Sequence, residues 1–137
     1  MSDLLDRVRL RGWRLTAQRR VVAQSLAGDN VHLTAEGVHE RAVALLPEIS
    51  RATVYNTLNE LVAMGEVAVV VPDGRANRYD PNVVDPHHHL HCTHCGALED
   101  VQAINVDKLG IVHPDHGFEV DGVDVVFKGV CPACGQE

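Results

Sequence analysis

Four cysteines form two pairs whose spacing is typical of a zinc site. Each pair belongs to a C-x-x-C-G sequence, at residues 92–96 and 131–135, and 35 residues separate the two pairs. Two residues between cysteines let both sulfurs reach one ion, and the glycine permits the tight turn that follows. Disulfides or a redox pair are the alternative, but no secretion signal is present and we expect a reducing compartment. The pattern predicts a structural Zn²⁺ at Cys92, Cys95, Cys131 and Cys134, with His94 exposed.

A second group of candidate ligands, rich in histidine and carboxylate, precedes and follows the first cysteine pair. Residues 87–91 read His-His-His-Leu-His, with Asp80 and Asp85 before them and Asp100 after them. In an extended chain the first, third and fifth of these residues point to the same side, and imidazoles at i and i+2 can chelate one ion. A solvated histidine tract is the alternative. Imidazoles and carboxylates without thiolate suit Fe²⁺ or Mn²⁺, whereas four thiolates suit Zn²⁺.

Charge is distributed unevenly along the chain. The 137 residues carry 12 Lys and Arg against 19 Asp and Glu, a net charge of −7. Residues 1–80 hold ten Arg and ten acids, whereas residues 81–137 hold two Lys against nine acids. Six of the arginines lie between positions 7 and 20 with no acid among them. Because phosphate binding depends on the local field rather than on the total, the arginine-bearing half is a candidate for binding DNA.

Four helices and a two-stranded hairpin are predicted in the arginine-bearing half. Capping residues and 3.6-residue spacing place the helices, caps included, at Asp3–Arg11, Thr16–Ala27, Thr34–Leu46 before Pro47, and Ser50–Gly65. The third helix should bury an apolar face that includes Leu45. A wing follows, with strands at 66–71 and 75–79 around a Pro-Asp-Gly turn. This order of elements predicts a winged helix-turn-helix domain.

The fourth predicted helix carries polar residues suited to reading DNA on the face opposite its apolar stripe. Arginine and asparagine can hydrogen-bond base edges, and an exposed tyrosine ring can touch a thymine methyl group. A solvated face that binds nothing is the alternative, but the nearby arginines favour double-stranded DNA as the partner. One such helix would bind weakly, so we expect a homodimer. The candidate DNA contacts are Arg51, Thr53, Tyr55 and Asn56 on this helix, and Arg14, Arg19 and Arg75 beside it.

The acidic half is predicted to be a small α/β dimerisation domain, which makes the fold class α+β. Strands near 98–101 and 117–128 and a short helix around 106–111 would complete it, and Trp13, Phe118 and Phe127 are expected in the core. The predicted division is a DNA-binding domain at 1–80, a hinge at 81–85 and a metal-binding dimerisation domain at 86–137. No run of roughly 18 apolar residues and no secretion signal is seen, so we expect a cytoplasmic protein with no membrane partner.

These features together resemble the Fur family of metal-dependent repressors over nearly the whole chain. The resemblance is carried by the predicted winged helix, the C-x-x-C-rich half, the stretch Ile49–Leu58 and the H-x-H before the first cysteine pair. It implies a metal-loaded dimer that binds operator DNA and represses transcription. It also implies a regulatory ion held by His32, Asp80, His87, His89 and Asp100, with Asp85 as the competitor of Asp80.

Within the family the chain is most similar to the peroxide-sensing PerR branch, which includes the CatR-type catalase repressors. Asp100 stands where iron-sensing members typically carry Glu, and Asn56 stands where many of them carry Arg. Pro86 and Val123 occupy positions where iron sensors tend to carry His, so the additional site of iron sensors is depleted. These differences favour a peroxide sensor.

The PerR resemblance implies a chemical signal as well as a metal. Peroxide would react at bound Fe²⁺, oxidise His32 or His87, and so release the repressor from DNA. Sensing of iron, zinc or nickel availability is the alternative within the same family. An enzyme is not expected, because the H-x-E and P-C-x-x-C combination of zinc deaminases is absent.

Overall fold

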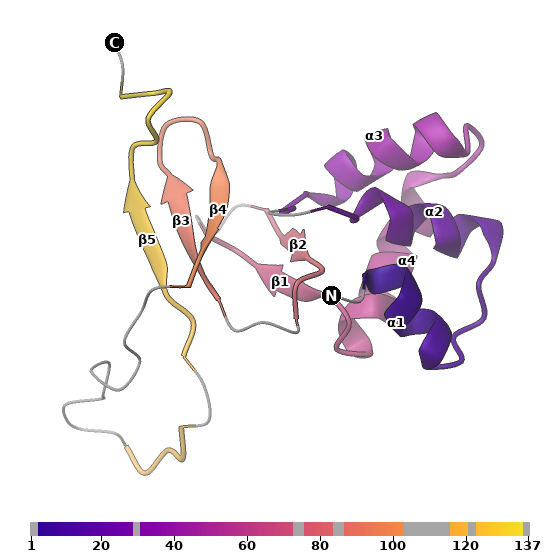
Figure 1. The fold of residues 1–137 in the computed structure, drawn as a ribbon, viewed down its shortest axis with the longest axis horizontal. Coiled ribbons are helices and arrows are strands. Elements are labelled where there is room, and N and C mark those ends of the chain that lie inside the picture. Colours follow the sequence, from indigo (N-terminus) through magenta and orange to yellow (C-terminus); the bar gives the residue numbers. More distant parts are fainter. Residues whose placement is uncertain are drawn as a thin grey trace. The chain divides into compact units, whose positions relative to one another are not determined.

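The computed structural model describes residues 3–28, 31–72, 76–83, 87–102, 116–120 and 123–135. The chain divides into two compact units, residues 1–85 and 86–137, called here the first and second units. The helices that the structure describes all lie in the first unit, and each unit contains its own small sheet (Figure 1). The predicted α+β class is therefore confirmed. Among the described residues no helix is both long enough and apolar enough to cross a bilayer.

Four capped helices form most of the first unit. At each N-terminus the side chain of the predicted cap accepts a hydrogen bond from the backbone N–H three residues later, which satisfies one of the amides that a helix leaves unpaired there. The second helix ends two residues earlier than predicted, and Gly65 follows the fourth with a φ of +77° that favours glycine. The helices are α1 (Leu4–Leu10), α2 (Ala17–Ser25), α3 (Ala35–Leu45) and α4 (Arg51–Ala63).

The apolar faces of these helices meet in one core. Its fully buried side chains include Val8, Val22, Val38 and Leu58, one from each helix. The prediction that Leu45 belongs to this core is wrong, because Leu45 is exposed at the last position of α3. The backbone leaves the helix at the next residue, Leu46, whose side chain turns inward and packs against the core instead.

The wing is a short antiparallel hairpin. It consists of β1 (Ala68–Val70) and β2 (Arg78–Asp80), which are shorter than the predicted strands, and Arg75 in the turn lies outside the described residues. β2 also contacts the segment just before α3 through a backbone hydrogen bond from Tyr79 N–H to the carbonyl of Leu33, 2.8 Å long. The Tyr79 ring is buried in the core, so the wing is fastened to the helices.

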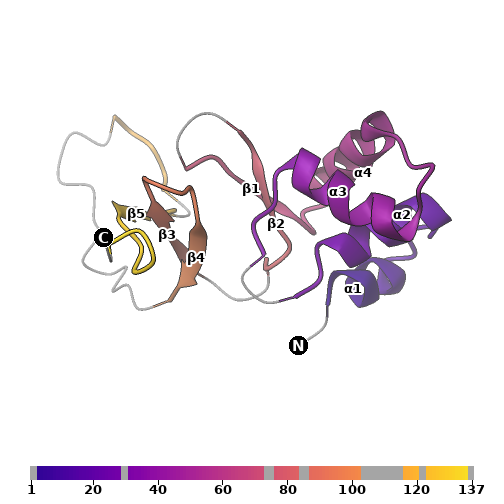
Figure 2. The ribbon, with the colours of Figure 1, turned by 90° about the horizontal axis from the view of Figure 1, so that it is seen from above.

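The second unit is built on a three-stranded sheet. β3 (His88–Cys92) lies in the middle, antiparallel to β4 (Leu98–Val101) and parallel to β5 (Val126–Gly129) (Figures 1 and 2). The strand predicted at 117–128 is wrong in extent, because the described residues before Val126 are not in a strand. The helix predicted around 106–111 lies outside the described residues.

Two aromatic residues predicted in the core are exposed instead. Phe118 lies in an irregular segment, and Phe127 on β5 pairs with Leu90 on β3, which is also exposed. The alternation of Val123, Val125 and Phe127 predicts a half-buried strand, but no element that the structure describes covers the face that carries Phe127. Trp13 is half-buried against the core of the first unit, with the Arg19 guanidinium 4.6 Å from its ring centre.

Candidate metal centres and DNA-reading face

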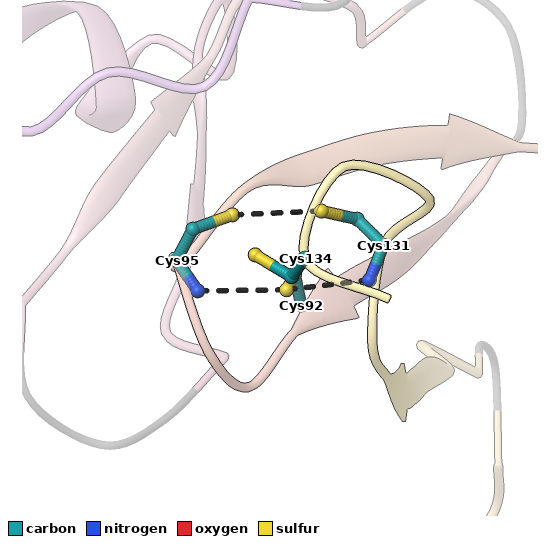
Figure 3. A group of neighbouring side chains, drawn as sticks. All are labelled: Cys92, Cys95, Cys131 and Cys134. Atoms are coloured by element: carbon teal, nitrogen blue, oxygen red, sulfur yellow. Dashed lines mark hydrogen bonds between the residues drawn. The ribbon is translucent and has the colours of Figure 1, made fainter. Parts of the chain in front are cut away.

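The four cysteines lie together in the second unit. Figure 3 shows their side chains pointing toward one another: Cys92 ends β3, Cys95 lies in the turn that follows, and Cys131 and Cys134 lie in the turn after β5. Parallel pairing of these strands, with Cys92 opposite Gly129, puts the two turns side by side. The four sulfur atoms all lie within 4.8 Å of one another, and the sulfurs of Cys95 and Cys131 are 3.8 Å apart. Zn–S bonds of about 2.3 Å in a tetrahedron require sulfurs ~3.8 Å apart, so the cluster fits zinc.

The hydrogen bonds of the cluster also suit a cation. The backbone N–H groups of Cys95 and Cys131 donate to the sulfur of Cys92 at 3.5 and 3.4 Å, and they lower the pKa of Cys92 to about 5. The neighbouring sulfurs of Cys131 and Cys95 raise the pKa of Cys134 to about 12. All four cysteines are free thiols. The sulfurs therefore differ in how readily they ionise, and a divalent cation would stabilise the thiolate form of all four.

In the first unit, His32 and Asp80 form a buried pair. Their nearest nitrogen and oxygen, Nε2 and Oδ2, are 3.5 Å apart, and each side chain is only 2% exposed. The backbone bridge between Leu33 and Tyr79 holds the two residues beside each other, although 48 positions separate them in the sequence. Asp80 Oδ1 also accepts a hydrogen bond from the backbone N–H of Asn82 at 2.9 Å. Its competitor in the sequence, Asp85, lies outside the described residues.

In the second unit, His87, His89 and Asp100 form a group of three. The Nε2 atoms of His87 and His89 lie 3.5 and 3.7 Å from Asp100 Oδ1, and the two rings meet edge to face with centres 4.9 Å apart. His89 on β3 faces Asp100 on β4 in the strand register, so sheet formation brings the carboxylate to the imidazoles. Two nitrogens and one oxygen converge here, as they do on an ion with mixed ligands.

The other histidines of the second unit differ in their surroundings. His88 accepts a hydrogen bond at Nδ1 from the backbone N–H of Val125, 3.0 Å away, which makes it part of the sheet. His91 is buried, and neither of its ring nitrogens has a hydrogen-bond partner in the part of the chain that the structure describes. His94 is exposed as predicted, and His113 lies outside the described residues.

The predicted DNA-reading face lies on α4. Arg51, Tyr55 and Asn56 are exposed there, whereas Thr53 is half-buried and its hydroxyl accepts a hydrogen bond from Ser50 at 2.9 Å. The Arg51 guanidinium lies on the carboxylate of Glu36 at the start of α3. No local pattern predicts this pair, because its members are 15 residues apart and lie on different helices.

The two described arginines beside α4 differ in their contacts. Arg14 is exposed. The guanidinium of Arg19 donates to the Glu60 carboxylate at 3.0 Å and to the backbone carbonyl of Arg14 at 2.8 Å. Arg19 therefore has structural contacts as well as a position near α4.

Comparison with known proteins identifies the family. A profile of the Ferric uptake regulator family matches residues 10–128. The chain belongs to this family. The transcriptional regulator FurA of Mycobacterium tuberculosis is 32% identical over 135 residues, which cover 98% of this chain and 91% of FurA. The peroxide operon regulator of Bacillus subtilis is 27% identical over 138 residues, which cover 100% and 94% of the two chains.

A solved structure extends the same relationship to the fold. A zinc-bound manganese uptake regulator superposes with a TM-score of 0.76 at 27% identity, over 95% of this chain and 99% of that one. The resemblance to the Fur family is thus confirmed, and the chain is a metal-responsive transcriptional regulator of that family. Its relatives are named for ferric uptake as well as for peroxide response, so the family alone leaves the signal open.

Proposed function

We propose that this Fur-family regulator is a peroxide-sensing repressor. It binds operator DNA as a homodimer that carries one structural Zn²⁺ and one regulatory Fe²⁺ or Mn²⁺ per subunit. The observation that carries the proposal is the chemistry of the donors: one cluster is made only of thiols, and the other candidate ligands are imidazoles and carboxylates. Thiolates select Zn²⁺, whereas nitrogen and carboxylate oxygen suit Fe²⁺ and Mn²⁺, so one chain can keep two metals apart.

Each group of imidazoles and carboxylates supplies too few ligands by itself. His32 and Asp80 offer one nitrogen and one oxygen, and the group at His87, His89 and Asp100 offers two nitrogens and one oxygen. We infer that the two groups bind the same ion. Together they would supply five protein ligands to Fe²⁺ or Mn²⁺, and bound Fe²⁺ would supply redox chemistry toward peroxide.

A shared ion would couple metal binding to DNA binding. His32 and Asp80 belong to the unit with the DNA-reading helix, and the other three ligands belong to the unit predicted to form the dimer. Binding of one ion by both groups fixes the orientation of α4, so that the two copies in a dimer can enter successive major grooves. A coupling free energy of about 1–3 kcal/mol would change DNA affinity roughly 5- to 150-fold.

Peroxide sensing follows from the ligand type. The imidazoles and carboxylates would hold Fe²⁺, which would supply the redox chemistry. One oxygen atom of peroxide would then be inserted into the imidazole of His32 or His87, and the other oxygen would leave as water. An oxidised imidazole is a poorer ligand, so the two units would no longer share an ion and the dimer would leave its operator. Base selection is assigned to Arg51, Thr53, Tyr55 and Asn56, and phosphate contacts to Arg14, Arg19 and Arg75.

Duplex binding and mass analysis test the proposal together. The wild-type chain should bind its operator only with Mn²⁺ or Fe²⁺. His32→Ala should abolish this metal-dependent binding while the fold and the zinc remain intact. His94→Ala, which changes an exposed histidine, is the matched control. Peroxide should release the Fe²⁺ form and add one oxygen atom to a peptide containing His32 or His87. Release without that addition would support the alternative, sensing of metal availability, and equal binding with and without metal would contradict both readings.

A further inference from the structure

The start of α4 presents an arginine whose contact is unusually well formed for an exposed residue. Arg51 Nε donates to Glu36 Oε2 at 2.9 Å, and Arg51 Nη2 donates to Glu36 Oε1 at 2.9 Å. The two side chains are 71% and 54% exposed. Exposed ion pairs of this kind contribute little to stability, because solvent screens them and fixing two long side chains costs entropy. The geometry of the pair therefore needs an explanation other than stability.

The electrostatics of the two helices explain why Arg51 pairs with a residue of α3. It is the first residue of α4, where the helix dipole disfavours a cation, and the first turn of α4 contains no acid. Glu36 lies in the first turn of α3, where an acid is favoured, and it supplies the opposite charge from the neighbouring helix. The hydrogen bond from Arg51 lowers the pKa of Glu36, and Glu36 raises the pKa of Arg51, so both remain charged at neutral pH.

The contact leaves one edge of the guanidinium directed away from the carboxylate. Glu36 accepts from the edge formed by Nε and Nη2, and this leaves the edge formed by Nη1 and the second hydrogen of Nη2. That remaining edge is a pair of parallel donors, which matches the O6 and N7 acceptors of guanine in the major groove. The ion pair borders a surface groove of about 410 Å³ that Tyr55 and Asn56 also line.

We propose that Glu36 is a positioning residue for DNA recognition, which holds one edge of Arg51 so that the other edge reads a guanine. The inference rests on the proposed function, because it requires α4 to enter the major groove. It adds a residue of α3 to the residues that select the base sequence. It also predicts that the role of Glu36 depends on Arg51 and is confined to one base pair.

The test measures base preference with the full-length Mn²⁺-loaded chain. Selection from a randomised duplex library defines the preferred site, and the base pair whose preference disappears in Arg51→Ala is the one that Arg51 reads. Fluorescence anisotropy then compares the guanine duplex with duplexes changed at that base pair alone. Arg51→Ala should reduce the discrimination about 5- to 150-fold, the range of a bidentate contact. Glu36→Gln should reduce it about fivefold or more, with other positions unchanged.

A double mutant and a matched charge control separate positioning from a simple charge effect. In the Arg51→Ala background, Glu36→Gln should have no further effect on discrimination. Glu40→Gln removes a charge from an exposed residue one turn further along α3 and should preserve the preference. The proposal is overturned if Glu36→Gln leaves discrimination unchanged, including the case in which it alters the affinity for all duplexes equally.

The remaining outcomes distinguish this inference from the proposed function. Metal-dependent binding that persists while Arg51→Ala changes no base preference would overturn the inference and leave the proposed function standing. Absence of metal-dependent binding by the unmodified chain would overturn both.

Discussion

Arg7 joins α1 to the wing in the first unit. Its Nε donates to Glu66 Oε2 at 3.0 Å, and its Nη2 donates to the carbonyls of Glu66 and Pro81 at 3.1 and 2.7 Å. The side chains of Arg7 and Glu66 are 14% and 13% exposed. Arg11 reaches the same carboxylate at 3.3 Å, but its side chain is 47% exposed. Arg7 therefore contacts Glu66 in a place shielded from solvent, and Arg11 contacts the same carboxylate in a place open to solvent.

We expect Arg7→Ala to lower the free energy of unfolding by about 2–4 kcal/mol. The change removes the charge-assisted hydrogen bonds of Arg7 to Glu66 and Pro81, and it leaves a shielded carboxylate with a weaker partner. Such a loss costs more than the interaction itself contributes. Arg11→Ala should cost about 1 kcal/mol or less, because its contact is open to solvent. Trp13 is the only tryptophan and lies in the first unit, so urea titration followed by its fluorescence reports this unit.

Arg7→Lys is a third variant for the same comparison. It keeps the positive charge but loses the planar guanidinium that donates to several acceptors at once. Its unfolding free energy should lie between those of wild type and Arg7→Ala. Pro81 directly follows the candidate ligand Asp80, so Arg7→Ala should also weaken Mn²⁺ binding, while Arg11→Ala should not. Equal and small effects of Arg7→Ala and Arg11→Ala on unfolding would refute the argument from shielding.

Three further substitutions test separate parts of the structure. Cys95→Ser should lose zinc, because three thiolates do not complete a four-sulfur site, whereas the control His94→Ser should retain zinc. Metal analysis of the purified proteins measures this, and zinc retained in Cys95→Ser would refute the assignment. His91→Leu should raise the free energy of unfolding by about 1 kcal/mol, because both ring nitrogens of His91 are buried without a hydrogen-bond partner among the described residues. Urea titration followed by circular dichroism measures this, and a lower free energy of unfolding would show that His91 has a polar partner. Ser50→Ala should cost about 1 kcal/mol by Trp13 fluorescence, and no change would mean that its cap on α4 contributes nothing.

Features that depend on neighbours in the sequence could be predicted without a structure. The N-terminus of each helix was predicted correctly, because a cap needs only a short polar side chain and the amide three residues later. The cysteine cluster is similar in kind, since each C-x-x-C pair brings its own two sulfurs together within a turn. Only the meeting of the two pairs requires the parallel pairing of β3 with β5.

Features that depend on distant residues could not be predicted in this way. The partners of Arg7 and Arg51 lie 59 and 15 residues away, and no periodic pattern links them. Burial was overestimated for Phe127 because alternation shows that a strand has an apolar face but not that a second layer covers it. The bridge between Leu33 and Tyr79 places Asp80 beside His32, a contact that no local pattern predicts, whereas Asp85 lies outside the described residues.

The central strand of the second unit links the zinc cluster to three of the proposed regulatory ligands. β3 ends in Cys92, and within the same strand His89 faces Asp100 on β4. If zinc holds the turns after β3 and β5 together, its removal should disturb the register that brings Asp100 to the imidazoles. We therefore expect an asymmetry. Zinc removal should abolish Mn²⁺ binding, whereas Asp100→Ala should weaken Mn²⁺ binding and leave zinc in place. Titration of both proteins with Mn²⁺ checks this, and undiminished Mn²⁺ affinity without zinc would show that the sheet holds its register alone.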